Sequence, residues 1–242
     1  MTESKTALVT GANKGIGREI ARRLAADGYR VWLGCRDHER GEAAAAELRA
    51  LGLDVRQLDL DVTSDALCAT AAQALARQTD RLDVLVNNAG VALELRARPS
   101  EEPVDQIKAI YEVNVFGPIR VTQAFLPLLK ASAAARVVMM SSGLGSLGTA
   151  TDPDSPFYGT NYLGYNSSKS ALNGVTVAFA KALGPLGIKV NAACPGYVAT
   201  DLNGHSGYRT VEQGAEIAVR LATLDAAGPT AGYFNEDGPL PW

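Results

Sequence analysis

The sequence predicts an α/β fold, in which one doubly wound parallel sheet has helices on both of its faces. Three observations lead to this prediction. Short apolar runs alternate with longer amphipathic, Ala-rich segments along the 242 residues. The connections between successive apolar runs are long enough for the crossovers that parallel strands require. A glycine-rich segment, residues 11–17, joins the first apolar run to the first amphipathic segment, at the edge where such sheets bind ligands.

The individual elements follow from the hydrophobic periodicity. Residues 6–10 form a continuous apolar strand, and residues 15–27 form a helix with Ile16, Ile20 and Leu24 on one face, ended by Gly28. Further strands are predicted at residues 29–35, 55–60, 82–86, 136–141 and 189–193, with a short one at 232–234. Helices are predicted at residues 39–51, 65–78, 100–111, 118–130, 162–183 and 211–224. Residues 143–161 contain Gly, Pro, Asp and Ser and are predicted to form a surface loop.

Composition and charge exclude several classes of function. Hydrophobic residues make up 47% of the chain, and the length allows one large domain or two small ones. A single domain over residues 1–242 is predicted. The net charge of −3 provides no basic excess for binding nucleic acid or an anionic membrane. No apolar run approaches the roughly 18 residues of a membrane span, and the polar start of the chain has no room for the apolar core of a signal peptide.

The cysteines, the histidines and the absence of certain motifs exclude further classes of site. Cys35, Cys68 and Cys194 are odd in number and far apart, so no disulfide framework is predicted, and a cytoplasmic location is expected. His38 and His205 stand in no recognisable ligand cluster, so no metal site is predicted. The sequence also lacks the motifs of serine hydrolases and of phosphate-loop nucleotidases.

The first motif with chemical content is the glycine-rich segment. Gly11, Gly15 and Gly17 have the spacing G-x-x-x-G-x-G between a strand and a helix. Glycines allow the backbone to approach a pyrophosphate closely, and the N-terminus of the following helix stabilises its charge. This context favours a dinucleotide site on a Rossmann-type sheet. A tight turn that binds no ligand is the alternative interpretation of the same residues.

The second motif is a tyrosine followed four positions later by a lysine. Tyr165 and Lys169 lie on one face of a predicted helix. A neighbouring ammonium favours the phenolate and so lowers the pKa of the tyrosine, which suits a general acid and base. A solvated Tyr–Lys pair is the alternative.

Together the motifs resemble those of the short-chain dehydrogenase/reductase family along nearly the whole chain. Within that family the chain is most similar to the carbonyl reductase branch, because of Asn13-Lys14, Cys35-Arg36-Asp37, residues 195–198 and Trp242. The residues that match family motifs in chain order are residues 10–17, Asn87, Asn88, Ala89, Gly90, Asn114, Ser142, Tyr165, Lys169 and residues 195–200.

The resemblance implies hydride transfer between a nicotinamide and a carbonyl or alcohol carbon. It assigns Ser142 to polarise the substrate carbonyl and Tyr165 to deliver the proton. Lys169 would hold the nicotinamide ribose and lower the pKa of Tyr165, and Asn114 would support Lys169 through an ordered water. Two alternatives stay open, namely that Ser142 caps a strand end and that Asn114 caps a helix N-terminus before Val115.

The resemblance also implies a set of cofactor-binding residues and a preference for NADP(H). The position where NAD enzymes carry an acid is Cys35, followed by Arg36, which can pair with a 2′-phosphate; Lys14 adds a second cation. Ordinary surface cations are the alternative, and Asp37 could repel the phosphate. The expected cofactor-binding residues are Gly11, Asn13, Lys14, Gly15, Ile16, Gly17, Arg36, Asp61, Val62, Asn87, Ala89, Gly90, Tyr165, Lys169, Pro195, Gly196, Val198 and Thr200.

The chain departs from the family pattern between Ser142 and Tyr165, which are separated by more residues than in most members. Residues 143–161 are therefore interpreted as a loop insertion. We expect this loop to cover the apolar segment 176–181 and to favour a monomer over a homodimer or homotetramer. A short lid after Thr200 predicts an open pocket, with Phe157, Tyr158, Tyr162 and Tyr197 as candidate lining residues.

The function predicted from the sequence is an NADP(H)-dependent reductase that converts a small-molecule ketone, aldehyde or quinone to an alcohol. An NAD-dependent alcohol dehydrogenase and a catalytically idle dinucleotide-binding sensor are the alternatives. The natural substrate is not predicted, because one fold serves many substrates.

Overall fold

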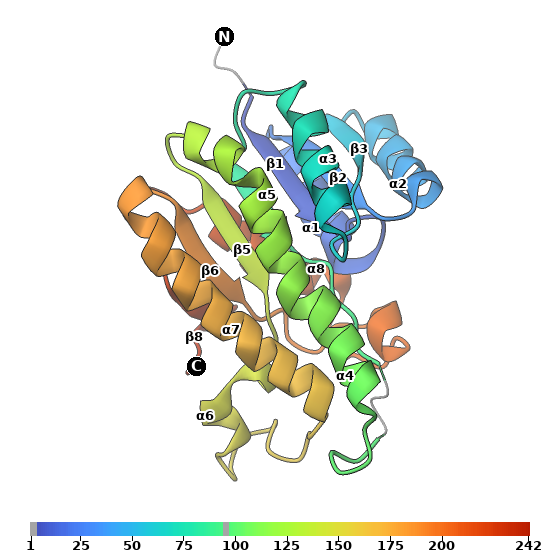
Figure 1. Cartoon of the computed structure of the whole chain (residues 1–242), viewed down its shortest axis with the longest axis vertical. Coiled ribbons are helices and arrows are strands. Elements are labelled where there is room, and N and C mark those ends of the chain that lie inside the picture. The colour runs from blue at the N-terminus through green and yellow to red at the C-terminus, as the bar shows by residue number, and fades with distance from the viewer. Residues whose placement is uncertain (1–3, 94–96) are drawn as a thin grey trace.

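An eight-stranded sheet runs through the centre of the molecule (Figure 1). The computed structural model describes residues 4–93 and 97–242. The strand order is β3-β2-β1-β4-β5-β6-β7-β8; all neighbours are parallel except β7 and β8. The strands are β1 (Thr6–Thr10), β2 (Arg30–Cys35), β3 (Val55–Asp59), β4 (Val84–Asn87), β5 (Arg136–Met140), β6 (Lys189–Ala193), β7 (Tyr233–Asn235) and β8 (Gly238–Pro239). The predicted doubly wound sheet is confirmed.

Helices cover both faces of this sheet. One face carries α1 (Gly15–Ala26), α2 (His38–Ala50) and α8 (Val211–Ala222), and the other carries α3 (Asp65–Ala76), α5 (Gly117–Ala131) and α7 (Leu163–Leu183). The helix α4 (Val104–Tyr111) lies beside α7 (Figure 1). Successive side chains of a strand point to opposite faces. Ala7 and Val9 of β1 therefore pack with α1, whereas Leu8 packs in the cluster that contains Phe125 of α5.

The sheet has its switch point between β1 and β4. The chain moves from β1 outward to β2 and β3, and then returns to the other side of β1. The connections after β1 and β4 therefore leave in opposite directions, which opens a crevice at the carboxyl ends of these strands. The glycine-rich segment and the residues after β4, β5 and β6 all lie at this edge.

Some predicted boundaries were wrong by a few residues. The helix predicted at residues 100–111 begins at Val104, directly after Pro103. Leu82 is not part of β4, although its N–H donates to Leu128 at 3.0 Å. The antiparallel β8 was not predicted, because two residues carry no readable periodicity.

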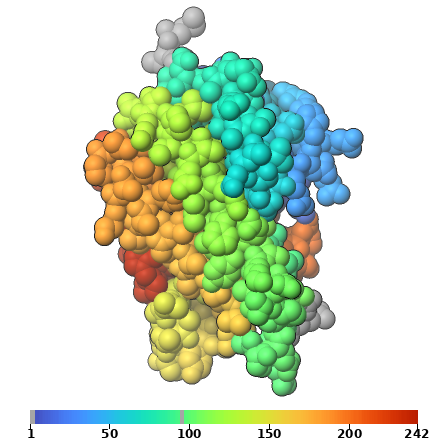
Figure 2. All heavy atoms as spheres, in the orientation of Figure 1, coloured from blue at the N-terminus to red at the C-terminus, as the bar shows by residue number. Residues whose placement is uncertain are grey.

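The loop at residues 143–161 is partly helical and does not cover segment 176–181. Residues Gly143–Gly145 form a 3₁₀ turn, and Leu147–Ala150 form α6. The segment packs against the first half of α7, where a Cβ at Gly145 would lie 2.7 Å from the Cβ of Lys169. Figure 2 shows it in yellow at the lower end of the molecule, away from the orange end of α7. The expected covering contact is therefore wrong, and the monomeric state stays a prediction without that support.

Two further features concern the described residues only. No helix among them is long and apolar enough to cross a membrane, and no group of three or more His, Cys, Asp or Glu side chains in them is arranged to hold a metal ion. The three cysteines are free and buried.

The different burial of two phenylalanines predicts that replacing them will destabilise the protein to very different extents. Phe125 is fully buried between the sheet and α5, whereas Phe116 is 46% exposed. Phe125→Ala is expected to lower the free energy of unfolding by about 3–5 kcal/mol, because it removes packing and leaves a cavity. Phe116→Ala is the matched control, with a loss below about 1 kcal/mol. Urea denaturation measures both, and equal losses would contradict the assignment.

Candidate active site

A cavity of about 1550 Å³ occupies the crevice at the carboxyl ends of the strands. It extends from the glycine-rich segment past the ends of β2, β3, β4 and β5 to the segment after β6. Most residues predicted from the sequence line it. These are Gly11, Asn13, Lys14, Gly15, Ile16, Gly17, Arg36, Asp61, Val62, Ala89, Gly90, Ser142, Tyr165, Lys169, Pro195, Gly196, Val198 and Thr200.

The glycine-rich segment forms a close-packed turn in which side chains have no room. Gly11 has φ +64°, and a Cβ there would lie 2.9 Å from the Cα of Ala89. A Cβ at Gly17 would lie 2.4 Å from the Nδ2 of Asn88. Helix α1 begins at Gly15 with no acidic residue in its first turn, so its free N–H groups and dipole favour an anion in the cavity. The turn fits a dinucleotide pyrophosphate.

Asn87 does not line the cavity, in contrast to the prediction. It is the last residue of β4, and its Nδ2 donates to Thr122 of α5 at 3.1 Å. The next residue, Asn88, lines the cavity instead and donates through Nδ2 to the Thr10 carbonyl at 2.9 Å. Alternation along the chain explains the exchange, because neighbouring side chains leave a strand end in opposite directions. Asn88 belongs to the same motif, but the motif does not indicate which of its side chains faces the ligand.

Ser142, Tyr165 and Lys169 come together from two elements. Ser142 follows the end of β5, and the other two residues stand one turn apart at the start of α7. The Ser142 hydroxyl hydrogen-bonds with Tyr165. It also accepts from the N–H of Leu144 at 3.3 Å, so it caps the 3₁₀ turn as well. The same Ser142 hydroxyl therefore makes the contact expected of a catalytic serine and the contact expected of a cap.

The ionisation of the pair differs from the prediction. Burial raises the pKa of Tyr165 to about 12, and the hydrogen bond from Ser142 offsets only part of that effect. Burial lowers the pKa of Lys169 to about 8. The Nζ of Lys169 lies 5.7 Å from the ring centroid of Tyr165 and donates to the Met140 carbonyl at 2.8 Å. The expected lowering of the tyrosine pKa is therefore absent, because loss of solvent on burial is the largest effect on Tyr165.

Asn114 stands within a π-helical turn, Glu112–Phe116, that joins α4 to α5 without a break. It therefore does not cap a helix N-terminus. Its side chain exchanges two hydrogen bonds of 2.9 Å with the backbone of Val91, and its Nδ2 also donates to Ser168 at 3.1 Å. A π turn adds one residue to the helix and is common at functional sites. Here it carries a 1% exposed amide that fixes the chain after β4 against α7.

The end of β2 combines a buried thiol with exposed charges. Cys35 is 2% exposed and accepts backbone hydrogen bonds from Ala12 and Asn13, and burial raises its pKa to about 11. Arg36 is exposed and lines the cavity. Asp37 caps α2 by accepting from the N–H of Arg40 at 3.0 Å and pairs with that arginine. The charge of Asp37 is thus balanced within α2, which reduces its expected repulsion of a phosphate.

Lys14 forms an ion pair with Asp201, and His205 contacts the same carboxylate at 2.8 Å. Both partners keep the pKa of Asp201 below its usual range. Asp61, which follows β3, accepts from the N–H and the hydroxyl of Thr63 at 2.9 and 2.7 Å. One of its oxygens makes both bonds.

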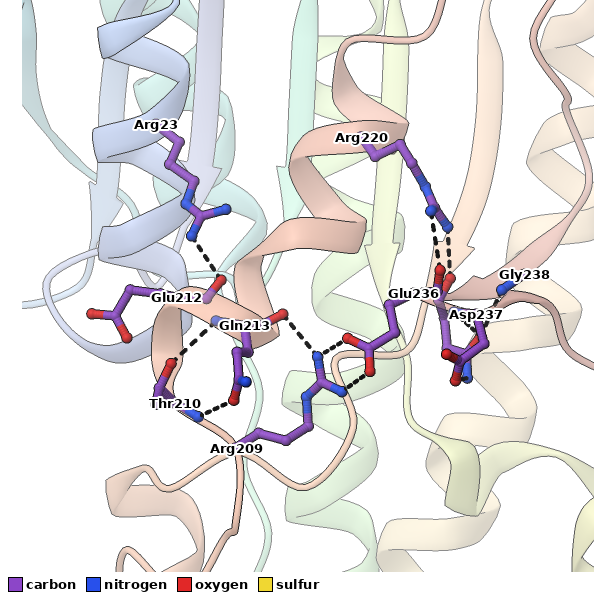
Figure 3. A network of polar contacts seen from close by, with 10 residues as sticks. Arg23, Arg209, Thr210, Glu212, Gln213, Arg220, Glu236, Asp237 and Gly238 are labelled. Atoms are coloured by element: carbon purple, nitrogen blue, oxygen red, sulfur yellow. Dashed lines mark hydrogen bonds and ion pairs between the residues drawn. The ribbon is translucent and has the colours of Figure 1, made fainter.

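The short lid after β6 is fixed at its base. Arg209 and the backbone at Tyr197 and Ala199 exchange two hydrogen bonds, of 3.1 and 2.9 Å. The guanidinium of Arg209 pairs with Glu236 in the turn between β7 and β8, as Figure 3 shows. It also packs over Gly196, where a Cβ would lie 2.6 Å from its Cδ. The lid is therefore small, as predicted, and its two ends are held together.

The aromatic residues proposed for the pocket divide into two groups. Tyr162 and Tyr197 line the cavity. Phe157 packs on Gly143 instead, and Tyr158 is 55% exposed outside the lining. Apolar lining residues that the sequence reasoning missed include Val91, Met140, Leu144 and Leu202. Only their positions next to the motifs, at strand ends, could have indicated them.

Comparisons with known proteins agree with this geometry. A family model described as short chain dehydrogenase matches residues 5–209. The (+)-neomenthol dehydrogenase of Arabidopsis thaliana is 35% identical over 94% of each chain, and the (−)-isopiperitenone reductase of Mentha piperita is 34% identical over 97% of each. The solved structure of an NADPH-bound carbonyl reductase from chicken fatty liver superposes with a TM-score of 0.87 at 27% identity, covering 99% of this chain and 100% of that one.

Proposed function

This chain belongs to the short-chain dehydrogenase family, and from that premise we propose that it is an NADP(H)-dependent carbonyl reductase. The whole chain, residues 1–242, would act as one catalytic domain. The observation that carries the proposal is the convergence of Ser142, Tyr165 and Lys169 beside a glycine-lined crevice. A sensor without catalytic function would not require this convergence.

The close-packed glycine turn supports a dinucleotide in the crevice. Backbone N–H groups at the start of α1 would hold the pyrophosphate, and Lys169 would hold the ribose next to the nicotinamide. The nicotinamide would supply the hydride when bound. The relatives include reductases, and one structural relative holds NADPH.

The protein's own residues would handle the carbonyl oxygen. Ser142 would donate a hydrogen bond to that oxygen and stabilise the negative charge that develops on it. The Tyr165 hydroxyl, with a pKa of about 12, is protonated at neutral pH and would give its proton to the same oxygen. Asn114 would keep the segment after β4 and the start of α7 in register, through Val91 and Ser168.

The direct test is NADPH consumption against a panel of aldehydes, ketones, quinones and enones. We expect turnover of at least one carbonyl class, with NADPH preferred over NADH. Oxidation of a panel of alcohols with NAD⁺ tests the alternative of an alcohol dehydrogenase. Cofactor binding without turnover of either panel would favour the sensor.

The cofactor preference is proposed to depend on Arg36. Arg36→Asp is expected to shift the ratio of kcat/KM for NADPH over NADH toward NADH by about 10–100-fold, because it removes a cation and adds an acceptor for ribose hydroxyls. Arg30→Asp is the matched control, since Arg30 stands at the start of β2, pairs with Asp54 and is outside the cavity lining. Steady-state kinetics with both cofactors measures the ratio. An unchanged ratio in Arg36→Asp would transfer phosphate recognition to Lys14.

A further inference from the structure

Tyr233 of β7 contacts the backbone of the serine in the active site. It is 2% exposed, and it is among the largest fully buried side chains of the described residues. Its hydroxyl donates to the carbonyl oxygen of Ser142 at 2.5 Å. No sequence motif singled it out, because β7 is three residues long and lies 91 positions after Ser142.

We propose that Tyr233 is a positioning residue that holds the Ser142 hydroxyl in place for the substrate carbonyl. The inference rests on the proposed function. It concerns the peptide group between Ser142 and Gly143, which is one of the two that set the direction of the Ser142 side chain.

This peptide group is held on both of its sides. Its carbonyl accepts from Tyr233 and from the N–H of Gly145 at 2.8 Å. Its N–H, which belongs to Gly143, donates to the Sγ of Cys194 at 3.1 Å. The preceding residue, Ser141, donates its N–H to Ala193 of β6 at 2.8 Å. The peptide plane after Ser142 is thus held at its carbonyl and at its N–H, and the chain before it is held at the Ser141 N–H, which together restrict the direction of the Ser142 Cα–Cβ bond.

Trp242 in turn holds the ring of Tyr233. The two rings stack with centroids 5.5 Å apart and an interplanar angle of 19°. The backbone of Trp242 accepts from the N–H of Gly148 at 3.0 Å, and the Ser146 hydroxyl donates to the Pro241 carbonyl at 2.7 Å. Residues 241–242 are thus attached to the segment that follows Ser142. The contacts form a continuous set from Trp242 through Tyr233 to Ser142 and then to Tyr165.

Tyr233 would affect catalysis by holding Ser142 in position, and it would not itself contact the substrate. Tyr233 is absent from the cavity lining, whereas Ser142 and Tyr165 are part of it. Loss of its hydroxyl would leave the Ser142 carbonyl with one partner and let the peptide plane rotate. An active site loses rate when a reacting group departs from its productive position by a fraction of an ångström.

The test is a double-mutant cycle between Tyr233→Phe and Ser142→Ala. In the otherwise wild-type protein, Tyr233→Phe is expected to lower kcat by about tenfold, the equivalent of one lost hydrogen bond, with an unchanged Kd for NADPH. On the Ser142→Ala background it is expected to change kcat less than twofold, because the hydroxyl that it positions is already gone. A merely structural role would give the same factor on both backgrounds.

Tyr29→Phe is the matched control, because Tyr29 is also buried but lies before the start of β2, at the opposite end of the sheet. It is expected to keep wild-type kcat. Thermal denaturation of every variant confirms folding. Wild-type kcat in Tyr233→Phe, or an equal loss on both backgrounds, would overturn the positioning role. A wild-type protein that reduces no carbonyl would overturn the proposed function instead.

Discussion

Replacement of Tyr165 by Phe is expected to lower kcat for carbonyl reduction by about 10²–10⁴-fold, with the Kd for NADPH within about twofold of wild type. The ring and its packing remain, and only the transferable proton is lost. Because burial raises the pKa of Tyr165 to about 12, the wild-type hydroxyl carries its proton throughout the neutral range. Single-turnover kinetics and fluorescence titration with NADPH measure the two quantities.

The matched control for this experiment is Tyr158→Phe. Tyr158 lies in the loop that precedes α7, is 55% exposed and is outside the cavity lining, so this variant is expected to keep wild-type kcat. A Tyr165→Phe variant with near wild-type kcat would exclude Tyr165 as the proton donor. A large loss of NADPH affinity in that variant would show that the tyrosine acts in binding instead.

Lys169→Met is expected to lower kcat/KM for the carbonyl by at least about 10²-fold and to weaken NADPH binding as well. Lys169 lines the cavity with Tyr165 and is proposed to hold the ribose, so its loss is expected to affect rate and affinity together. This double effect distinguishes it from Tyr165→Phe. Lys181→Met, an exposed lysine on the same helix, is the control and is expected to change neither quantity.

Lys169→Met is also expected to differ from wild type in how its stability depends on pH. The pKa of Lys169 is lowered by burial from 10.5 to about 8, so between these two pH values the unfolded chain binds a proton that the native protein has released. The contribution of Lys169 to the free energy of unfolding therefore rises with pH across this window, by about 3 kcal/mol in total. Below pH 8 the native protein must bury the charge.

Methionine at position 169 removes this dependence. The stability of Lys169→Met relative to wild type is expected to be highest near pH 7 and to fall as the pH approaches 10. Comparison of the two proteins cancels the buried cysteines, whose pKa values are also shifted. Chemical denaturation at pH 7, 8, 9 and 10 measures the difference, and a constant value would refute a charged, buried Lys169.

Much of the fold was readable from local pattern. The strands β2 and β5 are continuous apolar runs after a first arginine, and β1 is apolar between two threonines. After its first residue β6 is apolar except for Asn191. Their burial on both faces leaves little freedom in how they pair. The motifs at the strand ends can also be recognised locally. A tight turn requires glycine, and a proton donor requires a side chain that can carry the proton, such as tyrosine. These features depend on short stretches of chain.

Other features depend on pairs of residues far apart in the chain. Asn88 replaces Asn87 in the cavity lining because β4 continues through Asn87, and neighbouring side chains at the strand end point in opposite directions. The pKa of Tyr165 moves upward because packing removes solvent, an effect that the spacing to Lys169 does not contain. The loop after Ser142 packs on the start of α7 and not on its second half, because Gly145, which has no side chain, fits closely against Lys169 there.

The sequence by itself determined the parallel sheet, the glycine turn and the identity of the candidate catalytic residues, since each is encoded in periodicity or in a short motif at a strand end. Only the tertiary structure decided which side chains face the cavity, how burial shifts the pKa values of Tyr165 and Lys169, and that Tyr233 contacts the Ser142 carbonyl. The physical reason is that desolvation and long-range hydrogen bonds arise between segments that meet only after folding. Tyr233 and Ser142 lie 91 positions apart, and no local pattern relates them.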